Sequence, residues 1–368
     1  MTEPLAGIKV VDFSRVLAGP LVAMTLGDLG ADVVKVESPL GDDTRRWLPP
    51  QDARGRAAYH HTANRNKRAI VLDLKSDPDR ELARRLCERA DVVVSNFLPG
   101  TLQRYGLDYE RVAAVNPGVV YCEISGFGEG AGAALPGYDP LVQALSGLMS
   151  VTGPPGAPSK TGVAVTDVVA ALYATVAVLA ALYARRDSGR GQRVTIDLLH
   201  ASLALLANQS TGYLASGDVP LALGNVHPSI EPFATYRAGD GELMICAGND
   251  AQFRRLADVL GLGDDARFAT NELRIANRDD LRVRLEAALA ARPCADWTER
   301  LAAAGVPAGP VQTIGEALSL ADTLGLAVVD ETDGVQTVAF PAHLSETPAT
   351  VRRRPPDLDE HSEEIRRA

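Results

Sequence analysis

The chain has 368 residues, 46% hydrophobic and 23% charged, a composition typical of globular proteins and a length that allows two domains. Its formal net charge of −10 argues against a protein that binds nucleic acid or anionic membranes over a broad surface. The four cysteines are scattered without a CxxC or Cys/His spacing, so neither a disulfide framework nor a metal site is expected.

The first 130 residues alternate strand and helix patterns. β-Branched runs predict strands at residues 8–13, 32–37, 68–74, 91–97 and 118–127, and helices are predicted at 20–30 and 79–90. Strands separated by helices predict an α/β fold with an open, doubly wound parallel sheet, which binds ligands beyond the carboxyl ends of its strands. No GxGxxG follows the first strand and no GxxxxGK[ST] occurs, so a dinucleotide-binding Rossmann enzyme and a P-loop NTPase are disfavoured.

The rest of the chain predicts a long helix and then a smaller α/β unit. Helices are predicted at 141–148, from about 167 to a stop at the glycines 189 and 191, and at 198–215, with a strand at 192–198. The small unit contains a strand at 242–248 and helices near 251–260, 279–291 and 296–305. The charged tail is expected to wrap the surface.

No signal peptide or membrane span is expected. The N-terminus lacks a basic region followed by an apolar one, and the most apolar run, residues 168–183, is shorter than the roughly 20 residues that span a bilayer. We therefore expect a soluble, cytoplasmic protein.

Asp167 stands at the start of the long apolar helix and has two compatible interpretations. Aspartate is a favoured helix N-cap, and the first helical turn favours negative charge. A carboxylate at a helix start, after the loop PPGAPSKTG, can also lie in a cleft and act as a nucleophile or base. The residues alone do not separate the two roles.

Other polar residues suggest a phosphate-bearing ligand or an acid–base pair. Positive charge recurs near the ends of predicted strands, at Lys67, Arg68, Lys75 and Arg104. This recurrence favours a phosphate-bearing ligand, although each residue taken alone is better explained by a solvated face with salt bridges. His227 and Glu231 form a possible acid–base pair, but the stretch that begins with His227-Pro228 is more typical of an extended linker between domains.

Several blocks, in order from about residue 4 to residue 355, together resemble a known family. They are GIKVVDFSRVLAGPLVAMTLGDLGADVVKVESP, NRNKRAIVLDLKS, ADVVVSNFLPGTLQRYGLDY, NPGVVYCEISGFGEGA, PGYDPLVQALSGLMSVTG, SGRGQRVTIDL, GNVHPSIEPF and AGVPAGPVQT. This pattern is similar to the class III CoA-transferases, the CaiB/BaiF or formyl-CoA transferase family.

The resemblance implies a Rossmann-like large domain, a smaller α/β domain and an obligate, interlocked homodimer. Residues 1–215 would form the first part of the large domain, 216–310 the linker and small domain, and 311–368 the return to the large domain and the tail. It also implies CoA, acyl-CoA and small carboxylic acids as substrates, with no tightly bound cofactor, metal, nucleic acid or membrane partner.

The resemblance assigns roles to particular residues. Asp167 matches the family's nucleophile, which forms an acyl-aspartyl anhydride and then an aspartyl-CoA thioester. The residues that match CoA contacts are Val16, Ala18, Leu72, Lys75, Asn96, Phe97 and Arg104, with Tyr138 and Asp139 beside the nucleophile. One departure is Ser38, where some relatives carry an arginine; the phosphate contact would be missing or supplied by Arg45 or Arg46.

Two alternatives to a transferase remain. The family also contains α-methylacyl-CoA racemases, which use a His–Asp pair where this chain has Tyr138 and Asp139. Because the tyrosine pKa is near 10, a phenol replaces an imidazole poorly as a base, which favours the transferase. The other alternative is a CoA-binding paralogue without catalysis. The glycine-rich lid of formyl-CoA transferases is not evident near residues 241–248, so oxalate or formate specificity is not expected.

Overall fold

The computed structural model describes residues 3–367, which divide into two compact units, each considered by itself. Unit 1 comprises the chain up to residue 148, residues 160–218 and residues from 326 onward; unit 2 comprises 149–159 and 219–325. The expected domain boundaries, at residues 215 and 310, place 149–159 and 311–325 in the large domain. In the structure the first of these pairs with unit 2, since the Gly224 backbone N–H donates to the Gly153 carbonyl at 2.8 Å.

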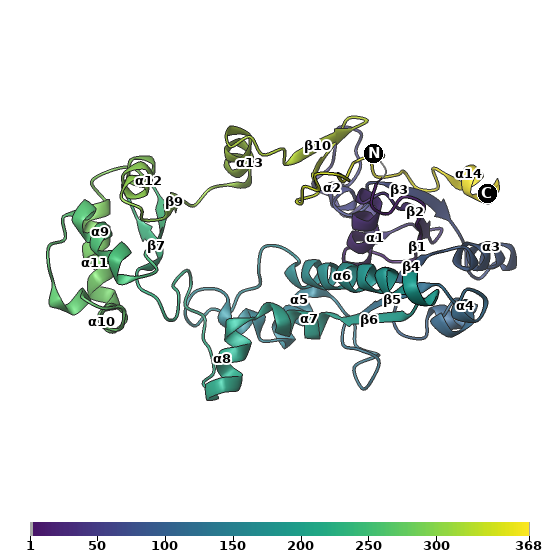
Figure 1. Ribbon diagram of the computed structural model, residues 1–368, viewed down its shortest axis with the longest axis horizontal. Coiled ribbons are helices and arrows are strands. Elements are labelled where there is room, and N and C mark those ends of the chain that lie inside the picture. Colours follow the sequence, from purple (N-terminus) through teal and green to yellow (C-terminus); the bar gives the residue numbers. More distant parts are fainter. Residues whose placement is uncertain (1–2, 368) are drawn as a thin grey trace. The chain divides into compact units, whose positions relative to one another are not determined.

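Unit 1 is built on a six-stranded parallel sheet with the strand order β3-β2-β1-β4-β5-β6 (Figure 1). The strands are β1 (Lys9–Asp12), β2 (Asp32–Glu37), β3 (Lys67–Val71), β4 (Val92–Ser95), β5 (Val120–Ser125) and β6 (Arg193–Asp197). The predicted parallel α/β sheet is confirmed. The strand order reverses between β1 and β4, and in open α/β sheets ligands bind in the crevice at that point.

Helices cover both faces of this sheet. α1 (Ala18–Asp28), α6 (Val165–Ser188) and α7 (Leu198–Leu205) pack on one face, and α3 (Asp77–Glu88), α4 (Tyr109–Val115) and α14 (Ser362–Arg367) on the other. The alternation of side chains along a strand explains the division, because Val10 and Val92 join the first core and Val11 and Val93 the second. Strands buried on both faces are therefore nearly continuous apolar runs.

α6 has a buried face of small and branched residues, including Ala170, Ala174 and Val178, in the core of unit 1. It ends at Gly189, which takes the left-handed conformation (φ 68°), as the sequence predicts. The expectation that this apolar run is too short to span a bilayer is not met, because the helix has 24 residues and enough apolar length to do so. Its packing in the core is the ordinary reason for such a composition.

Two predicted helices have different limits in the structure. The helix expected at 198–215 is broken into α7 and α8 (Asn208–Ser216), because Ala207 adopts φ 43° and interrupts the helical hydrogen bonds. α5 (Asp139–Leu145) begins at Asp139, two residues earlier than predicted, with Pro140 in its first turn.

The C-terminal segment returns to unit 1 and covers the edge strand β3. Asn66 accepts hydrogen bonds from the backbone of Arg352 and Arg353, and the His361 N–H donates to the Ala69 carbonyl. The hairpin of β10 (Val329–Thr332) and β11 (Val335–Val338) precedes this segment. The expected surface-wrapping tail is confirmed, and it leaves no long free edge at β3.

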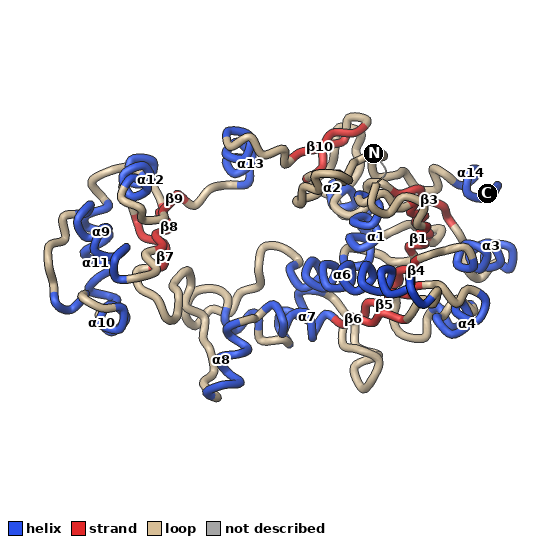
Figure 2. Tube along the Cα trace, in the orientation of Figure 1, coloured by secondary structure: helices blue, strands red, loops and turns tan. Residues whose placement is uncertain are grey.

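Unit 2 is a three-stranded antiparallel sheet packed against helices (Figure 2). Its sheet consists of β7 (Phe233–Arg237), β8 (Glu242–Cys246) and β9 (Ala308–Pro310). Its helices are α9 (Asp250–Leu260), α10 (Asn271–Ala276), α11 (Arg278–Leu289), α12 (Cys294–Ala303) and α13 (Ile314–Thr323). The predicted small α/β unit is present, although β7 was not predicted.

Candidate active site

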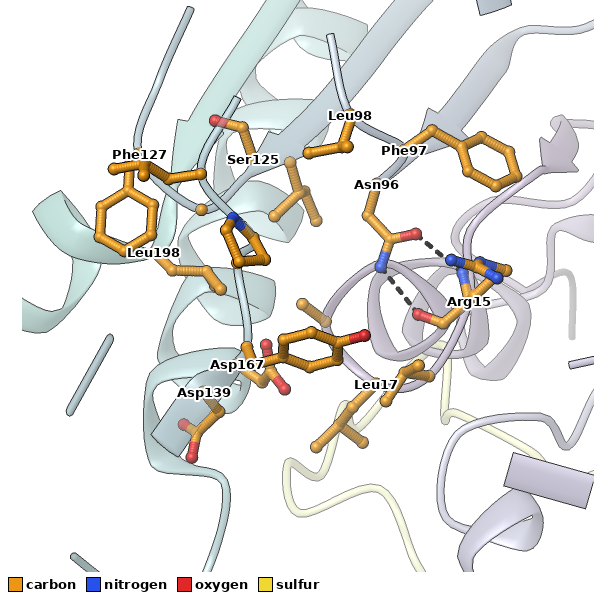
Figure 3. Close-up of a pocket in the computed structure, with 18 of the residues that line it drawn as sticks. Arg15, Leu17, Asn96, Phe97, Leu98, Ser125, Phe127, Asp139, Asp167 and Leu198 are labelled. Carbon is orange, nitrogen blue, oxygen red and sulfur yellow. Dashed lines mark hydrogen bonds between the residues drawn. The ribbon is translucent and has the colours of Figure 1, made fainter. Parts of the chain in front are cut away.

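A cavity of about 640 Å³ in unit 1 opens beyond the carboxyl ends of β1, β4 and β5 (Figure 3). The loops after β1 and β4 meet at its mouth, since the Asn96 carboxamide accepts from the Arg15 N–H at 2.8 Å and donates to the Arg15 carbonyl at 2.7 Å. Asn96 thus spans the point at which the strand order reverses. The cavity occupies the ligand-binding crevice expected of this fold.

Val16 lines the cavity in an unusual backbone conformation. Its φ of 67° is costly for a β-branched residue, so the surrounding structure must hold it there. Asp42 does so by accepting the Val16 N–H at 3.2 Å. The Asp42 carboxylate is in turn paired at 3.0 Å with the fully buried Lys35 ammonium, which also donates to the Ser14 carbonyl. This buried ion pair therefore fixes the loop after β1.

The charge of Asp42 is maintained by its partners. Burial alone would raise the pKa of this carboxyl, but the Lys35 charge and the hydrogen bond from Thr44 hold that pKa below its usual range. Asp42 and Lys35 were not singled out in the sequence. The Gly-Asp-Asp-Thr run after β2 is a capping pattern that indicates an ordered turn, but not its contact with residue 16.

Two of the basic residues expected near a phosphate are structural. Lys67 is fully buried and donates to Asp12 at 2.8 Å, to the Pro20 carbonyl and to Asn64. Arg68 pairs with Asp32 and Glu364. The phosphate interpretation is therefore wrong for these two, because the order of residues along the chain does not reveal the distant carboxylates, buried at Asp12 and exposed at Asp32 and Glu364, that pair with these cations.

Two glycines allow the loops around the cavity to touch. A Cβ on Gly126, after β5, would lie 2.4 Å from the Gly137 Cα, and a Cβ on Gly137 would lie 2.6 Å from the Gly126 Cα. Both residues line the cavity. Only glycine fits at such a distance between backbones, and the contact fixes the segment that leads to Tyr138 and Asp139.

Asp167 is not the N-cap of α6. The N-cap is Ala164, which has no side-chain acceptor, and Asp167 is the third helical residue. Asp139 from α5 supplies the acceptor instead, since one of its carboxylate oxygens accepts from the Thr166 N–H at 2.9 Å and from the Thr166 hydroxyl. The N-cap interpretation of Asp167 is wrong, and its carboxylate has no hydrogen-bond partner among residues 3–367.

The Asp167 carboxylate faces the cavity in a setting that favours its neutral form. Burial, and then the negative charge of Asp139, raises the pKa of Asp167 to about 7. Burial and the same Asp167 charge raise the pKa of Tyr59, whose ring packs edge-on against Trp47 at 4.9 Å. Among the described residues that line the cavity there is no histidine; Tyr138 occupies the rim and is 65% exposed. A carboxylate of raised pKa in a cleft is typical of a catalytic group.

A second cavity, of about 390 Å³, lies beside the first and shares Phe97 and Thr101 with it. It is lined by Ser38, by Leu72, whose side chain is buried, and by Lys75. Lys75 is exposed and has no ion pair among residues 3–367, so its ammonium is free to meet an anion. The two cavities therefore adjoin at Phe97 and Thr101.

The other proposed phosphate contacts lie outside these cavities. Arg104 is exposed and lines neither of them. Arg45 is bonded to both oxygens of Glu37 and to the Pro356 carbonyl, and Arg46 pairs with Asp43. Replacement of the missing arginine at Ser38 by Arg45 or Arg46 is therefore not supported.

The structure gathers most of the residues predicted for the site. Those that line the first cavity are Val16, Ala18, Asn96, Phe97, Tyr138, Asp139 and Asp167. The cavity is also lined by residues that were not predicted, among them Arg15, Trp47, Phe127 and Leu198. Arg15, Phe127 and Leu198 stand at the ends of predicted strands, a position that could have indicated them. The described residues contain no group of three or more side chains that could hold a metal ion.

His227 and Glu231 do not form an acid–base pair. Glu231 is buried in unit 2 and accepts hydrogen bonds from Tyr236 at 2.6 Å and Arg278 at 2.7 Å. The His227 ring accepts from the Ser229 N–H, and its carbonyl accepts from Arg278. These contacts favour the interpretation of this stretch as an anchored linker.

Comparisons with known proteins cover both units. The model of CoA-transferase family III matches residues 5–362. A succinate–glutarate CoA-transferase of Agrobacterium fabrum is 44% identical, over 98% of this chain and 94% of the relative. An acetyl-CoA:oxalate CoA-transferase of Acetobacter aceti is 37% identical, over 99% of this chain and 95% of the relative. The crystal structure of a CaiB/BaiF family protein from Brucella suis has a TM-score of 0.92 at 44% identity and covers 100% of this chain, with 99% of its own chain matched.

Proposed function

Since this chain belongs to CoA-transferase family III and is a CoA-transferase, we propose that it moves CoA between carboxylic acids through two covalent intermediates on Asp167. The observation that carries this proposal is the Asp167 carboxylate, which faces the cavity without a hydrogen-bond partner among the described residues. Such a carboxylate is free to act as a nucleophile.

The proposed first half-reaction exchanges the donor acid for the enzyme's own carboxylate. An Asp167 oxygen attacks the thioester carbonyl of the donor, the C–S bond breaks, and CoA leaves as a thiolate from an acyl-aspartyl anhydride. The thiolate then attacks the aspartyl carbonyl, which frees the donor carboxylate and leaves an aspartyl-CoA thioester. The thioester remains reactive enough for return of CoA, which a serine ester would not.

The second half-reaction reverses these steps with the acceptor. Its carboxylate attacks the aspartyl thioester, CoA leaves as a thiolate, and an anhydride with the acceptor forms. The thiolate attacks the acceptor carbonyl, which yields the new acyl-CoA and restores Asp167. Each tetrahedral intermediate carries an oxyanion, and backbone N–H groups of the glycine-bearing loops at Gly126 and Gly137 are suited to stabilise it.

Trapping of the intermediates tests this mechanism. Hydroxylamine added during turnover with a donor acyl-CoA should convert the Asp167 side chain to a hydroxamate, detected by mass on the tryptic peptide from Thr161 to Arg185. Asp167→Ala should abolish transfer while leaving the dissociation constant for CoA nearly unchanged. If active enzyme under turnover yields no modified Asp167, direct exchange in a ternary complex replaces the covalent route.

We propose dicarboxylic acids other than oxalate as the exchanged acids. The proposal is supported by the names of the relatives, which include succinate, glutarate and oxalate among their acids. Oxalate is disfavoured because the glycine-rich lid of formyl-CoA transferases is not evident near residues 241–248. A screen of CoA-thioester donors against carboxylic acid acceptors, with mass detection of the products, identifies the pair. Exclusive use of monocarboxylic acids would contradict the proposal.

The racemase alternative finds little support in the site. A second base is needed opposite Asp167, and the described lining residues include no histidine, while Tyr138 is exposed at the rim. We expect no wash-in of deuterium at the α-carbon of 2-methylacyl-CoA. Such exchange would make Asp167 a proton-transfer base.

We also propose an interlocked homodimer. It is supported by an exposed apolar stripe on α6, made of Leu172, Tyr173, Val176 and Tyr183, which a soluble enzyme needs to cover. Return of the C-terminal segment to unit 1 makes that unit from both ends of the chain, as a closed ring requires. A cytoplasmic location remains a prediction of the composition.

A further inference from the structure

Gln143 is a fully buried polar residue of α5 that lines neither cavity. Its carboxamide oxygen accepts from the Thr161 N–H at 2.9 Å and from the Thr161 hydroxyl at 3.3 Å. Its amide nitrogen donates to Asp139 at 2.7 Å and to the Val163 carbonyl at 3.4 Å. One side chain therefore holds both the segment before α6 and the carboxylate that caps α6.

A continuous chain of hydrogen bonds runs from Gln143 through Asp139 to Thr166, the residue before Asp167. Gln143 bonds one carboxylate oxygen of Asp139, and the other oxygen bonds the backbone and hydroxyl of Thr166. Thr166 directly precedes Asp167 in the first turn of α6. The N-cap residue, Ala164, has no side-chain acceptor, so the order of this turn depends on Asp139.

The direction of the Asp167 carboxylate must come from its backbone. No hydrogen bond to another described residue orients that carboxylate. In the proposed chemistry it is first a nucleophilic oxygen and then an electrophilic carbonyl, so a fixed hydrogen bond on either oxygen would oppose one of the two steps. A misplacement of about 1 Å can cost about a hundredfold in rate.

We propose that Gln143 is a positioning residue for CoA transfer: through Asp139 and residues 161–166 it fixes the first turn of α6 and thereby the approach of the Asp167 carboxylate to the thioester. This inference rests on the proposed function of Asp167. It assigns a catalytic consequence to a side chain that touches neither the substrate cavity nor the reacting atoms.

The first test replaces Gln143 by a residue of similar volume without these hydrogen bonds. Gln143→Met should lower kcat by about tenfold to a hundredfold while the dissociation constant for CoA stays within about twofold. The matched control is Ser146→Ala, at the C-cap of the same helix. It removes buried hydrogen bonds of the Ser146 hydroxyl to Ser202 at 2.7 Å, to the Gln143 backbone carbonyl at 3.5 Å and from the Leu148 N–H at 3.5 Å, but leaves the Gln143 side-chain bonds to Asp139 and to residues 161–163 in place. Wild-type kcat in Gln143→Met, or an equal loss in Ser146→Ala, overturns the proposal.

A donor–acceptor exchange tests the pairing even if Gln143→Met does not fold. Asp139→Asn turns an amide toward the Gln143 amide, and Gln143→Glu turns a carboxylate toward the Asp139 carboxylate, so each should lose about tenfold or more in kcat. The double variant restores a carboxylate that accepts from an amide and keeps acceptors for Thr161 and Thr166. The kcat of the double variant should be about tenfold higher than that of the less active single variant. A double variant no better than that single variant contradicts the inference.

Failure of the inference is distinguishable from failure of the proposed function. If the wild type transfers no CoA in the donor–acceptor screen, the proposed function fails. Crystal structures of the wild type and Gln143→Met then still decide the positioning role. We expect residues 161–167 to be displaced while the rest of α5 and α6 superposes; an unmoved Asp167 overturns the inference.

Discussion

At the scale of single residues, two neighbouring carboxylates, Asp139 and Asp167, determine the electrostatics of the site. Asp139 caps the helix that carries Asp167, and its negative charge also disfavours ionisation of Asp167. The sequence identified both residues, but it offered Asp167 as the N-cap and left that role open beside a catalytic one. It did so because spacing locates the helix start only within a few residues, and because a cap supplied from another helix leaves no local pattern.

The raised pKa of Asp167 predicts how transfer depends on pH. Since the nucleophile must be ionised and its pKa is about 7, kcat/KM should rise through pH 7 and level off near pH 8. At pH 6 the ionised fraction, and with it the rate, should be about a tenth of the plateau value. Initial rates measured from pH 5.5 to 8.5 with one donor–acceptor pair check this; a flat profile across that range would contradict it.

The same pKa predicts a gain in stability when the charge is removed. Asp167 ionises at a higher pH in the folded state than in the unfolded state, so its unfavourable contribution is absent near pH 4 and fully developed above pH 7. Asp167→Asn should therefore be more stable than the wild type at pH 8, by about 1–2 kcal/mol because the cavity admits water, and equally stable at pH 4. Melting temperatures at the two pH values show whether the difference appears only at the higher one.

The free ammonium of Lys75 predicts a salt-dependent contribution to CoA binding. Lys75 lines the second cavity without an ion-pair partner among the described residues, whereas Arg104 lines neither cavity. Lys75→Ala should weaken CoA binding by about threefold to tenfold at low salt, with a smaller loss at 0.5 M salt. Arg104→Ala is the comparison: calorimetry that shows a loss for Arg104 but none for Lys75 would remove Lys75 from the ligand path.

At the scale of elements, the parallel sheet could be predicted because its buried strands are dense apolar runs between helices. β2 begins and ends at the predicted residues, 32 and 37. The break between α7 and α8 could not be predicted from the sequence, because nothing in the residues around Ala207 indicates a positive φ. The contact of Asp42 with Val16 was also out of reach, since it joins the segments after two different strands.

The close approach of Gly126 and Gly137 predicts that the loop after β5 and the loop before α5 depend on each other for their positions. Gly137→Ala would put a Cβ 2.6 Å from the Gly126 Cα, so the segment leading to Tyr138 and Asp139 must shift. We expect kcat to fall by about tenfold or more. Gly128→Ala is a control for loop flexibility in the same cavity wall, because a Cβ there meets nothing within 4 Å, although its φ of 75° adds some strain. Full activity in Gly137→Ala, or a loss no larger than that of Gly128→Ala, would show that the contact between the two loops does not set the rate.

At the scale of the whole molecule, the unexplained feature is the apolar surface of α6. Val176 is 65% exposed on the same helix whose other face forms the core. Residues 326–367 return to unit 1 after the chain has left it to form unit 2, and noncovalent contacts such as those between Asn66 and Arg352 hold them there. In the interlocked dimer that we propose, each chain would pass through the loop that the other closes in this way, so the two could separate only if one loop opened.

Subunit exchange tests this interlocking. Light scattering should give the mass of a dimer, and affinity-tagged and untagged dimers mixed under native conditions should form no mixed dimers over days. Mixed dimers should appear after unfolding in denaturant and joint refolding. Val176→Glu, in the exposed stripe, should reduce the dimer yield on refolding, whereas Val115→Glu, at a similarly exposed valine of α4, should not. Rapid exchange between native dimers would show that the two subunits associate without passing through each other. Interlocked subunits cannot exchange in this way, because they separate only when one of the two chains unfolds.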